Sequence, residues 1–264
     1  MNFLEQKMVD HLKYLKNDFG VVEVKAEFEA EGSRLYELMR LKEIATLAGL
    51  GLVLKIGGAE AITDMFYAKS LGASVIVAPM VESGYAMRKY LEAIDKHFSS
   101  DEKKSIEFCA MIETYQAYTN TDSILSQKLG KLVNMIAVGR VDLSGSLEIA
   151  RTDINCSKIL KIVTEVFKKV KSKGLRTTMG GGIAKEAIPF ISELISKKLL
   201  DRYETRKIVF DGSKKNKNIE EGIVEANRFE LMWLENKKNY YDSIATEDDL
   251  RLVMLNSRIP PKNE

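Results

Sequence analysis

The stretch NMIAVGRVDLSGSL, residues 134–147, joins an apolar run directly to a polar segment. Met135 to Val138 are apolar without alternation, which is typical of a strand that is covered on both faces. Gly139, Arg140 and Asp142 follow at once. The C-terminal ends of parallel strands lie together on one face of an α/β fold, where active sites are built. The stretch therefore predicts a strand over Leu132–Val138 that delivers Asp142 and Arg140 to a functional face.

Short apolar runs of the same kind recur along the chain, separated by longer amphipathic segments that are typical of helices. The other predicted strands are Val21–Phe28, Leu52–Ile56, Ser74–Pro79, Ile106–Ile112, Leu175–Met179 and Lys207–Phe210. This alternation predicts an α/β fold with a parallel sheet. Doubly wound sheets and closed barrels share the pattern, so periodicity leaves both open.

Charged residues stand at several of these strand ends. Glu113 directly follows the strand at 106–112, and Lys55 lies near the end of the strand at 52–56. Mg²⁺ in proteins takes one or two carboxylates together with water and substrate oxygens, so Glu113 and Asp142 can hold a hard divalent cation. Equally, each carboxylate can cap the following helix or form a salt bridge. Spacing alone does not separate these interpretations.

Three segments in this order resemble the HpcH/HpaI aldolase and citrate lyase beta-subunit family: SVIVAPMVES (74–83), MIET (111–114) and VGRVDLSGSL (138–147). The resemblance covers roughly residues 20 to 215, and it implies a TIM-type (β/α)₈ barrel. It also implies that Glu113 and Asp142 bind Mg²⁺ or Mn²⁺.

The resemblance further implies that the segment from Gly139 through Arg140 to Asp142 helps to hold the substrate carboxylate. The implied chemistry is a metal-dependent carbon–carbon lyase or aldolase reaction through a metal-stabilised enolate. The implied substrate is a pyruvate-like 2-oxo acid or its acyl-thioester relative.

Two departures from the family pattern bear on activity. Lys55 stands where the family has an arginine that contacts the reacting oxygen, and lysine lacks the planar, two-pronged donor geometry. We expect Arg140 to supply a guanidinium from another direction. Before Val21 there is a polar helical segment at 2–17 and no strand. With seven strands found, the barrel either lacks its first strand or closes in another way.

Two other functions stay open. Lys55, desolvated by its apolar strand, can be a Schiff-base nucleophile if its pKa is depressed. Alternatively, the loss of the arginine and of a strand indicates a catalytically impaired barrel that serves as a binding or assembly subunit.

Composition narrows the class of protein. The 264 residues are 45% hydrophobic and 30% charged with a formal net charge of +2, which gives no reason to expect nucleic acid as a partner. The two cysteines lie far apart and predict reduced thiols. No apolar run of about 18 residues is present, and the N-terminus is too charged for a signal peptide. We expect a soluble, cytoplasmic enzyme that does not associate with membranes.

The C-terminal part changes character. We predict a barrel domain at 1–215 that includes the N-terminal helix, and a helical arm at 216–264. Within the arm, helices are expected at 218–241 and 248–256, with Thr246 as the N-cap of the second. Both predicted helices carry more apolar residues than packing against one side of the barrel would bury. Members of the family that the sequence resembles commonly exchange C-terminal helices between subunits. The apolar residues and the resemblance together predict a homo-oligomer whose interface includes residues 218–256 and helps to complete the active site in trans. The alternative is an arm that folds back and covers its own barrel.

Overall fold

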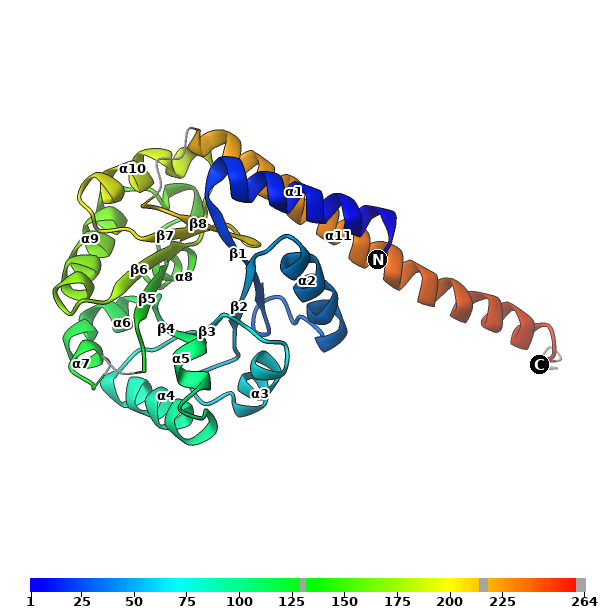
Figure 1. Cartoon of the computed structure of the whole chain (residues 1–264), viewed down its shortest axis with the longest axis horizontal. Helices are drawn as coiled ribbons and strands as arrows, with labels where there is room; N and C mark the ends of the chain where they lie inside the picture. Colours follow the sequence, from blue (N-terminus) through cyan, green and yellow to red (C-terminus); the bar gives the residue numbers. More distant parts are fainter. Residues whose placement is uncertain (129–131, 214–217, 260–264) are drawn as a thin grey trace, which may run out of the picture.

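The computed structural model describes residues 1–128, 132–213 and 218–259, and within these ranges eight strands form a closed barrel. Figure 1 looks along the barrel, with the strands as an inner ring and the helices around them. The strands are β1 (Val21–Glu27), β2 (Gly51–Lys55), β3 (Val75–Ala78), β4 (Glu107–Ile112), β5 (Met135–Gly139), β6 (Arg176–Gly180), β7 (Arg202–Glu204) and β8 (Ile208–Asp211). The fold is a TIM-type barrel, as the sequence predicts.

Helices follow most of the strands and cover the outside of the barrel (Figure 1). The longer ones are α1 (Phe3–Phe19), α2 (Leu35–Leu47), α3 (Ile62–Ser70), α4 (Gly84–His97), α9 (Ser157–Ser172), α10 (Ile188–Ser196) and α11 (Ile219–Asn256). The shorter ones are α5 (Glu102–Ser105), α6 (Tyr115–Thr119), α7 (Thr121–Leu125), α8 (Arg140–Ser146), η2 (Arg151–Asp153) and η3 (Lys185–Ala187).

The barrel closes through a hairpin. Strands β1 to β7 pair in parallel and in chain order, whereas β8 pairs antiparallel with both β7 and β1. Three residues join β7 to β8, and so short a connection permits antiparallel pairing alone. The expectation of a wholly parallel sheet is therefore wrong for β8. The reversed strand occupies the place between β7 and β1, so the barrel is complete with Val21 beginning its first strand.

Strand β7 is absent from the sequence prediction because it does not read as apolar. Arg202 and Glu204 point into the barrel, where Arg202 donates to Glu23 (2.7 Å) and Glu204 pairs with Lys25. Tyr203 faces outward and stacks on Phe210 with 4.8 Å between ring centroids. Beside its pairing with β6 and β8, the strand is stabilised by ion pairs and by aromatic stacking instead of an apolar run.

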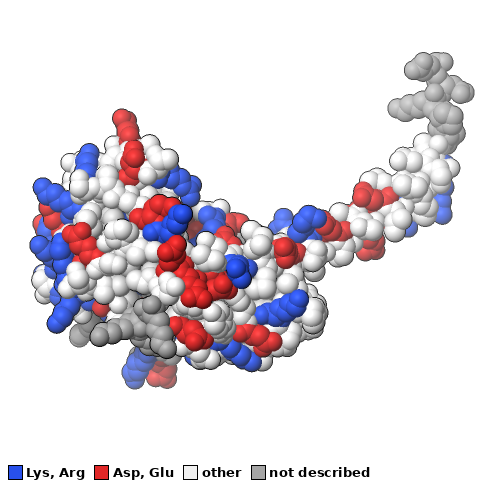
Figure 2. All heavy atoms as spheres, turned by 90° about the horizontal axis from the view of Figure 1, so that it is seen from above, with Lys and Arg blue, Asp and Glu red and all other residues white. Residues whose placement is uncertain are grey.

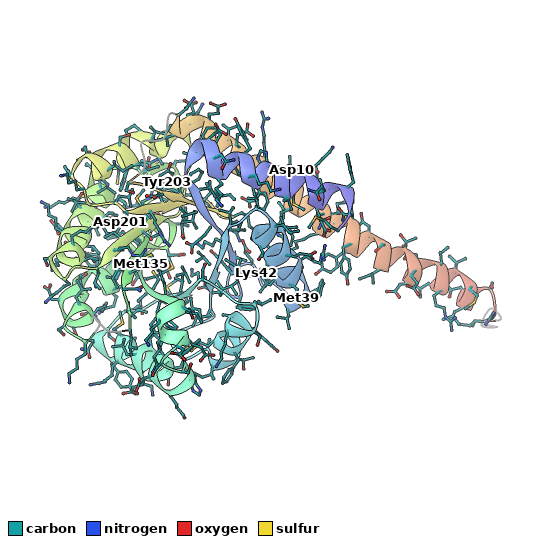
Figure 3. All side chains as sticks on the ribbon, in the orientation of Figure 1. Asp10, Met39, Lys42, Met135, Asp201 and Tyr203 are labelled. Carbon is teal, nitrogen blue, oxygen red and sulfur yellow. The ribbon has the colours of Figure 1, made fainter. Side chains whose placement is uncertain are left out.

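The hydrophobic core has two parts. A small cluster fills the barrel interior: Val53, Val75, Val77, Cys109, Met111, Met135, Ala137 and Val209. A larger one lies between the barrel and its helices and includes Leu54, Ile76, Ile136 and Tyr203. Figure 3 labels one residue of each, Met135 on β5 and Tyr203 on β7. Both faces of each strand are thus covered, which explains the continuous apolar runs in the sequence.

Helices α1 and α11 lie side by side on one flank of the barrel (Figure 1). They run antiparallel, since Asn2 at the start of α1 contacts Asn236 while His11 contacts Glu225. Phe229 and Trp233 are buried within the chain, so this half of α11 covers its own barrel. The predicted domain boundary at 215/216 lies outside the described residues.

The remainder of α11 projects away from the barrel as an arm (Figures 1 and 2). No residue from 242 to 259 is buried. The expected break before a second helix is wrong: α11 is continuous, and the Thr246 hydroxyl donates to the Asp242 carbonyl (2.8 Å) instead of capping a new helix. The segment has no glycine or proline that would interrupt the helix.

Figure 2 shows basic and acidic side chains interspersed over one face of the barrel. Among the described residues, no helix combines the length and the apolar character that crossing a membrane requires.

Candidate active site

The inward-facing side chains alternate along each strand and change from apolar to polar at the C-terminal mouth of the barrel. On β4, Cys109 and Met111 belong to the interior cluster, and Glu113 continues the same row two residues later. On β2, Val53 is interior and Lys55 follows by the same step. Because side chains alternate with a period of two, Lys55 and Glu113 also face inward, and they lie directly above the apolar interior at the C-terminal end of the barrel.

A cavity of 410 Å³ occupies this mouth. Lys55, Glu113, Gly139 and Asp142 all line it, so the structure brings together four of the five site residues expected from the sequence. Asn227 and Glu230 of α11 also line it, so the chain's own C-terminal helix forms part of the wall.

Glu113 is the most buried carboxylate of the cavity, with a relative exposure of 1%. Its Oε1 accepts a hydrogen bond from the Met80 amide (2.9 Å), and its Oε2 lies 3.5 Å from the Lys55 ammonium. Burial raises the pKa of Glu113, Lys55 and the Met80 amide oppose the rise, and the carboxylate of Asp142 adds to it. The pKa stays above its ordinary value, as is expected of a carboxylate that lacks sufficient positive charge.

Gly139 makes room for Glu113. A Cβ atom at position 139 would lie 2.6 Å from Glu113 Oε2, closer than real Cβ contacts, and 3.0 Å from the Glu113 Cβ, which is a tight contact. The end of β5 therefore needs glycine beside the buried carboxylate. Helix α8 begins directly afterwards and places Asp142 in its first turn.

Lys55 is buried and surrounded by carboxylates. Its Nζ lies 2.7 Å from Glu29 Oε2 as well as 3.5 Å from Glu113. Burial alone would lower the pKa of Lys55, but Glu113, Glu29 and Glu27 more than offset it, and the pKa is raised. The raised pKa favours the protonated ammonium form of Lys55, whereas a Schiff-base nucleophile needs a depressed pKa.

The Arg140 side chain points elsewhere. It is fully buried outside the cavity, where it donates to Asn155 Oδ1 (2.7 Å) and to the carbonyls of Gly181 (2.7 Å) and Gly182 (3.0 Å), and it stacks on Phe190. Burial lowers the pKa of Arg140 to about 10. These contacts connect loops at the barrel mouth, and they do not bring the guanidinium to Glu113 or Asp142.

Several residues of the cavity were not predicted from the sequence. Lys25 lies on β1, 3.1 Å from Glu27 and paired with Glu204 of β7. The signal was present, because Glu23, Lys25 and Glu27 alternate with the period of a strand. Arg151 of η2 and Arg206 of the β7–β8 hairpin also line the cavity. Nothing in their local sequence marks them.

The charges of the cavity fit a divalent cation. Among the described residues that line it, the carboxylates of Glu27, Glu29, Glu113, Asp142, Glu204 and Glu230 face four cations, Lys25, Lys55, Arg151 and Arg206. The excess is two negative charges. No group of three or more His, Cys, Asp or Glu side chains in the described ranges is arranged as a metal cluster. Glu113 and Asp142 are two carboxylates of the same cavity, and Mg²⁺ in proteins typically takes one or two carboxylates together with water and substrate ligands.

Comparison with known proteins agrees with this architecture. A family model described as HpcH/HpaI aldolase/citrate lyase matches residues 39–179, more than half of the 264-residue chain. No curated protein matches the chain.

Solved structures share the fold at low sequence identity. An HpcH/HpaI aldolase from Desulfitobacterium hafniense DCB-2 superposes with a TM-score of 0.61 and 16% identity, over 77% of this chain and 82% of that one. Citrate synthase SbnG gives a TM-score of 0.61 and 17% identity over 91% of each chain. Macrophomate synthase gives 0.54 and 14% over 70% of each. The likeness to these structures shows the fold, and the match of the family model shows that the chain belongs to the HpcH/HpaI aldolase/citrate lyase family.

Proposed function

We propose that this protein is a metal-dependent carbon–carbon lyase or aldolase that acts on a pyruvate-like 2-oxo acid. The observation that carries the proposal is Glu113, a buried carboxylate at the barrel mouth that shares a cavity with Asp142 and with an excess of negative charge. A buried, under-neutralised carboxylate is costly unless a cation binds beside it. Membership of a family of aldolases and lyases supports the same conclusion.

Glu113 and Asp142 would hold Mg²⁺ or Mn²⁺. When bound, such an ion acts as a Lewis acid that polarises the keto oxygen of the substrate and stabilises the enolate. The chain itself supplies a rigid position for Glu113, through the Met80 amide and the space left by Gly139. Backbone groups from Gly139 to Asp142 would face the substrate carboxylate.

Lys55 would support the reaction by charge. Its ammonium group is protonated and held between Glu29 and Glu113, so it can stabilise negative charge that develops in the cavity without forming a covalent bond. This is the role that the resemblance gives to an arginine at the corresponding position. Lys55 reproduces the charge of that arginine, and it does so with a single donor group.

The proposal is tested by a cleavage screen. Short 4-hydroxy-2-oxo acids are incubated with the protein and Mg²⁺, Mn²⁺ or EDTA, and the release of pyruvate is measured. We expect release that requires the metal and disappears in Glu113→Gln. Glu186→Gln, which removes an exposed carboxylate on η3, serves as the matched control. Equal release with metal and with EDTA would contradict the proposal.

We also propose that the protein is a homo-oligomer that assembles through the arm. Leu250, Leu252 and Val253 are 69%, 57% and 70% exposed, although an apolar surface of this kind is normally covered in solution. A second cavity of 490 Å³ lies beside the root of the arm and is lined by Tyr36, Met39, Trp233 and Tyr241. Figure 3 labels Met39 on α2. The chain's own α11 already lines the active-site cavity. We therefore place the partner subunit at the arm and not in the active site.

The projecting arm also favours a second candidate, a barrel that serves as a binding or assembly subunit without catalysis. The cleavage screen separates the two, since an assembly subunit releases no pyruvate with any metal while retaining its oligomeric state.

A further inference from the structure

One arginine beside the barrel mouth is buried without a carboxylate partner. Arg140 is 0% exposed. Within the described residues its guanidinium donates to neutral acceptors, Asn155 Oδ1 and two glycine carbonyls, and its Nε has no hydrogen-bond partner. A buried charge of this kind is costly, and an apolar side chain of similar volume is often as stable or more so. Stability alone therefore does not account for an arginine at this position.

The Arg140 guanidinium joins three segments of the barrel mouth. Arg140 itself begins α8, and its Nη1 donates to Asn155 in the loop after η2 (2.7 Å). Its Nη2 donates to the carbonyls of Gly181 (2.7 Å) and Gly182 (3.0 Å) in the turn after β6. The fixed fork of a guanidinium directs hydrogen bonds to two segments at once, whereas a lysine ammonium group is a compact charge on a flexible stem.

The turn after β6 lies directly against the backbone of α8. An added Cβ at Gly181 would lie 2.8 Å from the Val141 amide nitrogen and 2.9 Å from that of Arg140. Gly181 and Gly182 have φ angles of 81° and 62°, which glycine adopts without the strain that other residues incur. The two glycines thus bring the turn close enough for its carbonyls to reach the guanidinium.

Asp142 is the proposed metal ligand closest in sequence to this junction. It lies in the first turn of α8, two residues after Arg140, and it lines the active-site cavity together with the turn at 181–182. Helix α8 has seven residues, and so short a helix is marginal without tertiary contacts. Glu113, in contrast, directly follows a strand of the barrel and accepts from the Met80 amide. Asp142 therefore depends on contacts of α8 that Glu113 does not need.

We propose that Arg140 is a positioning residue, which fixes the start of α8 against the turn after β6 and the loop after η2 and so holds Asp142 in place as a ligand of the cation. This role rests on the proposed function, which assigns Asp142 to the metal site. It explains why the side chain turns away from the cavity, since its contacts are with the segments behind Asp142 and not with the substrate.

The test measures binding of Mn²⁺ by electron paramagnetic resonance of the free ion, without substrate. Arg140→Ala should weaken binding by roughly 10- to 100-fold, the usual effect of losing a residue that orients a metal ligand. Arg140→Lys should restore only part of the affinity. Arg88→Ala, which removes an exposed arginine of α4, is the control and should leave the affinity unchanged.

A double-mutant cycle separates positioning of Asp142 from a general loosening of the fold. In an Asp142→Ala background, Arg140→Ala should cause little further loss of Mn²⁺ affinity, because both changes act through the same ligand. General loosening would also disturb Glu113, and it would lower the affinity by the same factor in both backgrounds.

Chemical rescue tests the guanidinium itself. Arg140→Ala leaves a cavity of the shape of the lost group beside the same acceptors, so millimolar guanidinium chloride should restore part of the Mn²⁺ affinity. Sodium chloride at the same concentration should not. The rescue should be absent in the Arg140→Ala, Asp142→Ala double variant.

Asn155→Ala provides a milder test, should Arg140→Ala fail to fold. It keeps the arginine and removes one acceptor, so it should weaken Mn²⁺ binding less than Arg140→Ala, and again only while Asp142 is present. If the wild-type protein binds Mn²⁺, then unchanged affinity in these variants, or equal losses with and without Asp142, would overturn the role of Arg140 and leave the proposed function standing. A wild-type protein that binds no Mn²⁺ would overturn the proposed function, and this role with it.

Discussion

Lys55 Nζ and Glu113 Oε2 lie 3.5 Å apart at the barrel mouth, and both side chains are almost fully buried. The pair explains two properties of the cavity at once. Lys55 remains charged because carboxylates surround it, while Glu113 remains short of positive charge because Lys55 is shared with Glu29. One ammonium group therefore does not neutralise both carboxylates, and a divalent cation would supply the missing positive charge.

The first prediction concerns the chemistry of Lys55. Treatment with pyruvate and borohydride should give no adduct at Lys55, because the pKa of its ammonium group is raised by Glu113, Glu29 and Glu27 against the effect of burial. Peptide mass mapping is the measurement. A stable adduct on Lys55 would establish the Schiff-base mechanism in place of the metal-dependent one.

Lys55 should nevertheless matter for the rate. Lys55→Met should lower kcat for pyruvate release by roughly 100-fold, the typical cost of removing one electrostatic stabiliser of a developing negative charge. Lys158→Met, a change at an exposed position of α9, is the control and should leave kcat unchanged. Equal activity of Lys55→Met and the wild-type protein would exclude Lys55 from the mechanism.

The second prediction tests the space beside Glu113. Gly139→Ala introduces a Cβ at 2.6 Å from Glu113 Oε2, so the carboxylate must move. We expect loss of metal-dependent activity together with a cost of about 1–3 kcal/mol in the free energy of unfolding, which is typical of overpacking. Chemical denaturation and the cleavage assay are the measurements.

Gly145→Ala is the matched control, because Gly145 lies in α8 with nothing within 4 Å of its added Cβ. This substitution should retain activity and raise the free energy of unfolding by up to about 1 kcal/mol through helix propensity. Similar behaviour of the two alanine variants would show that Gly139 has no special relation to Glu113.

The third prediction concerns pH. Burial keeps the pKa of Glu113 above its ordinary value of 4.5, so protons should compete with the metal for this group at a higher pH than at a surface glutamate. Affinity for Mn²⁺ should therefore fall as the pH falls through the raised pKa. Calorimetric titrations over a pH series measure it, and an affinity that is constant down to pH 4.5 would contradict the role of Glu113.

The same shift has a consequence for stability. A carboxyl group whose pKa is higher in the folded than in the unfolded state stabilises the fold when protonated, and that stabilisation is lost as the pH rises through the folded-state pKa. At neutral pH the metal-free Glu113→Gln variant should therefore melt at a higher temperature than the metal-free wild-type protein. A lower melting temperature would show that Lys55 already compensates the charge.

The fourth prediction concerns the arm. Replacing Leu250 and Val253 together by glutamate should shift the mass in light scattering toward that of a monomer, since each side chain contributes about 1.5–3 kcal/mol when buried. Arg251→Glu adds negative charge at an exposed polar position of the same helix and should leave the mass unchanged. A monomeric wild-type protein at micromolar concentration would contradict the prediction.

Much of the site was predictable because the strands carry it. Once the runs ending at Lys55, Glu113 and Gly139 are assigned as parallel strands, their C-terminal ends must share one face. The position of Arg140 was not predictable in this way. It is the first residue of α8, and the direction of its side chain depends on Asn155 and Phe190, whose proximity the sequence does not reveal.

The strand order was less accessible than the site. Arg202 and Glu204 of β7 find their partners Glu23 and Lys25 on β1, 179 residues away in each case, so no local pattern identifies the strand. Strand β8 runs antiparallel because only three residues join it to β7, so its direction could not be predicted without β7. The continuity of α11 was missed because Thr246 and the acidic residues after it resemble a helix start, although a helix interior also accommodates them.

Formation of a metal-stabilised enolate is tested most directly by exchange of the methyl protons of pyruvate in D₂O, followed by proton NMR. Formation of the enolate requires loss of a methyl proton, so the signal decays if the protein stabilises that species. We predict decay with the wild-type protein and Mg²⁺ or Mn²⁺, and none beyond the protein-free rate with EDTA or with Glu113→Gln. A wild-type rate that is unaffected by EDTA, or equal to that of Glu113→Gln, would contradict the metal-dependent mechanism.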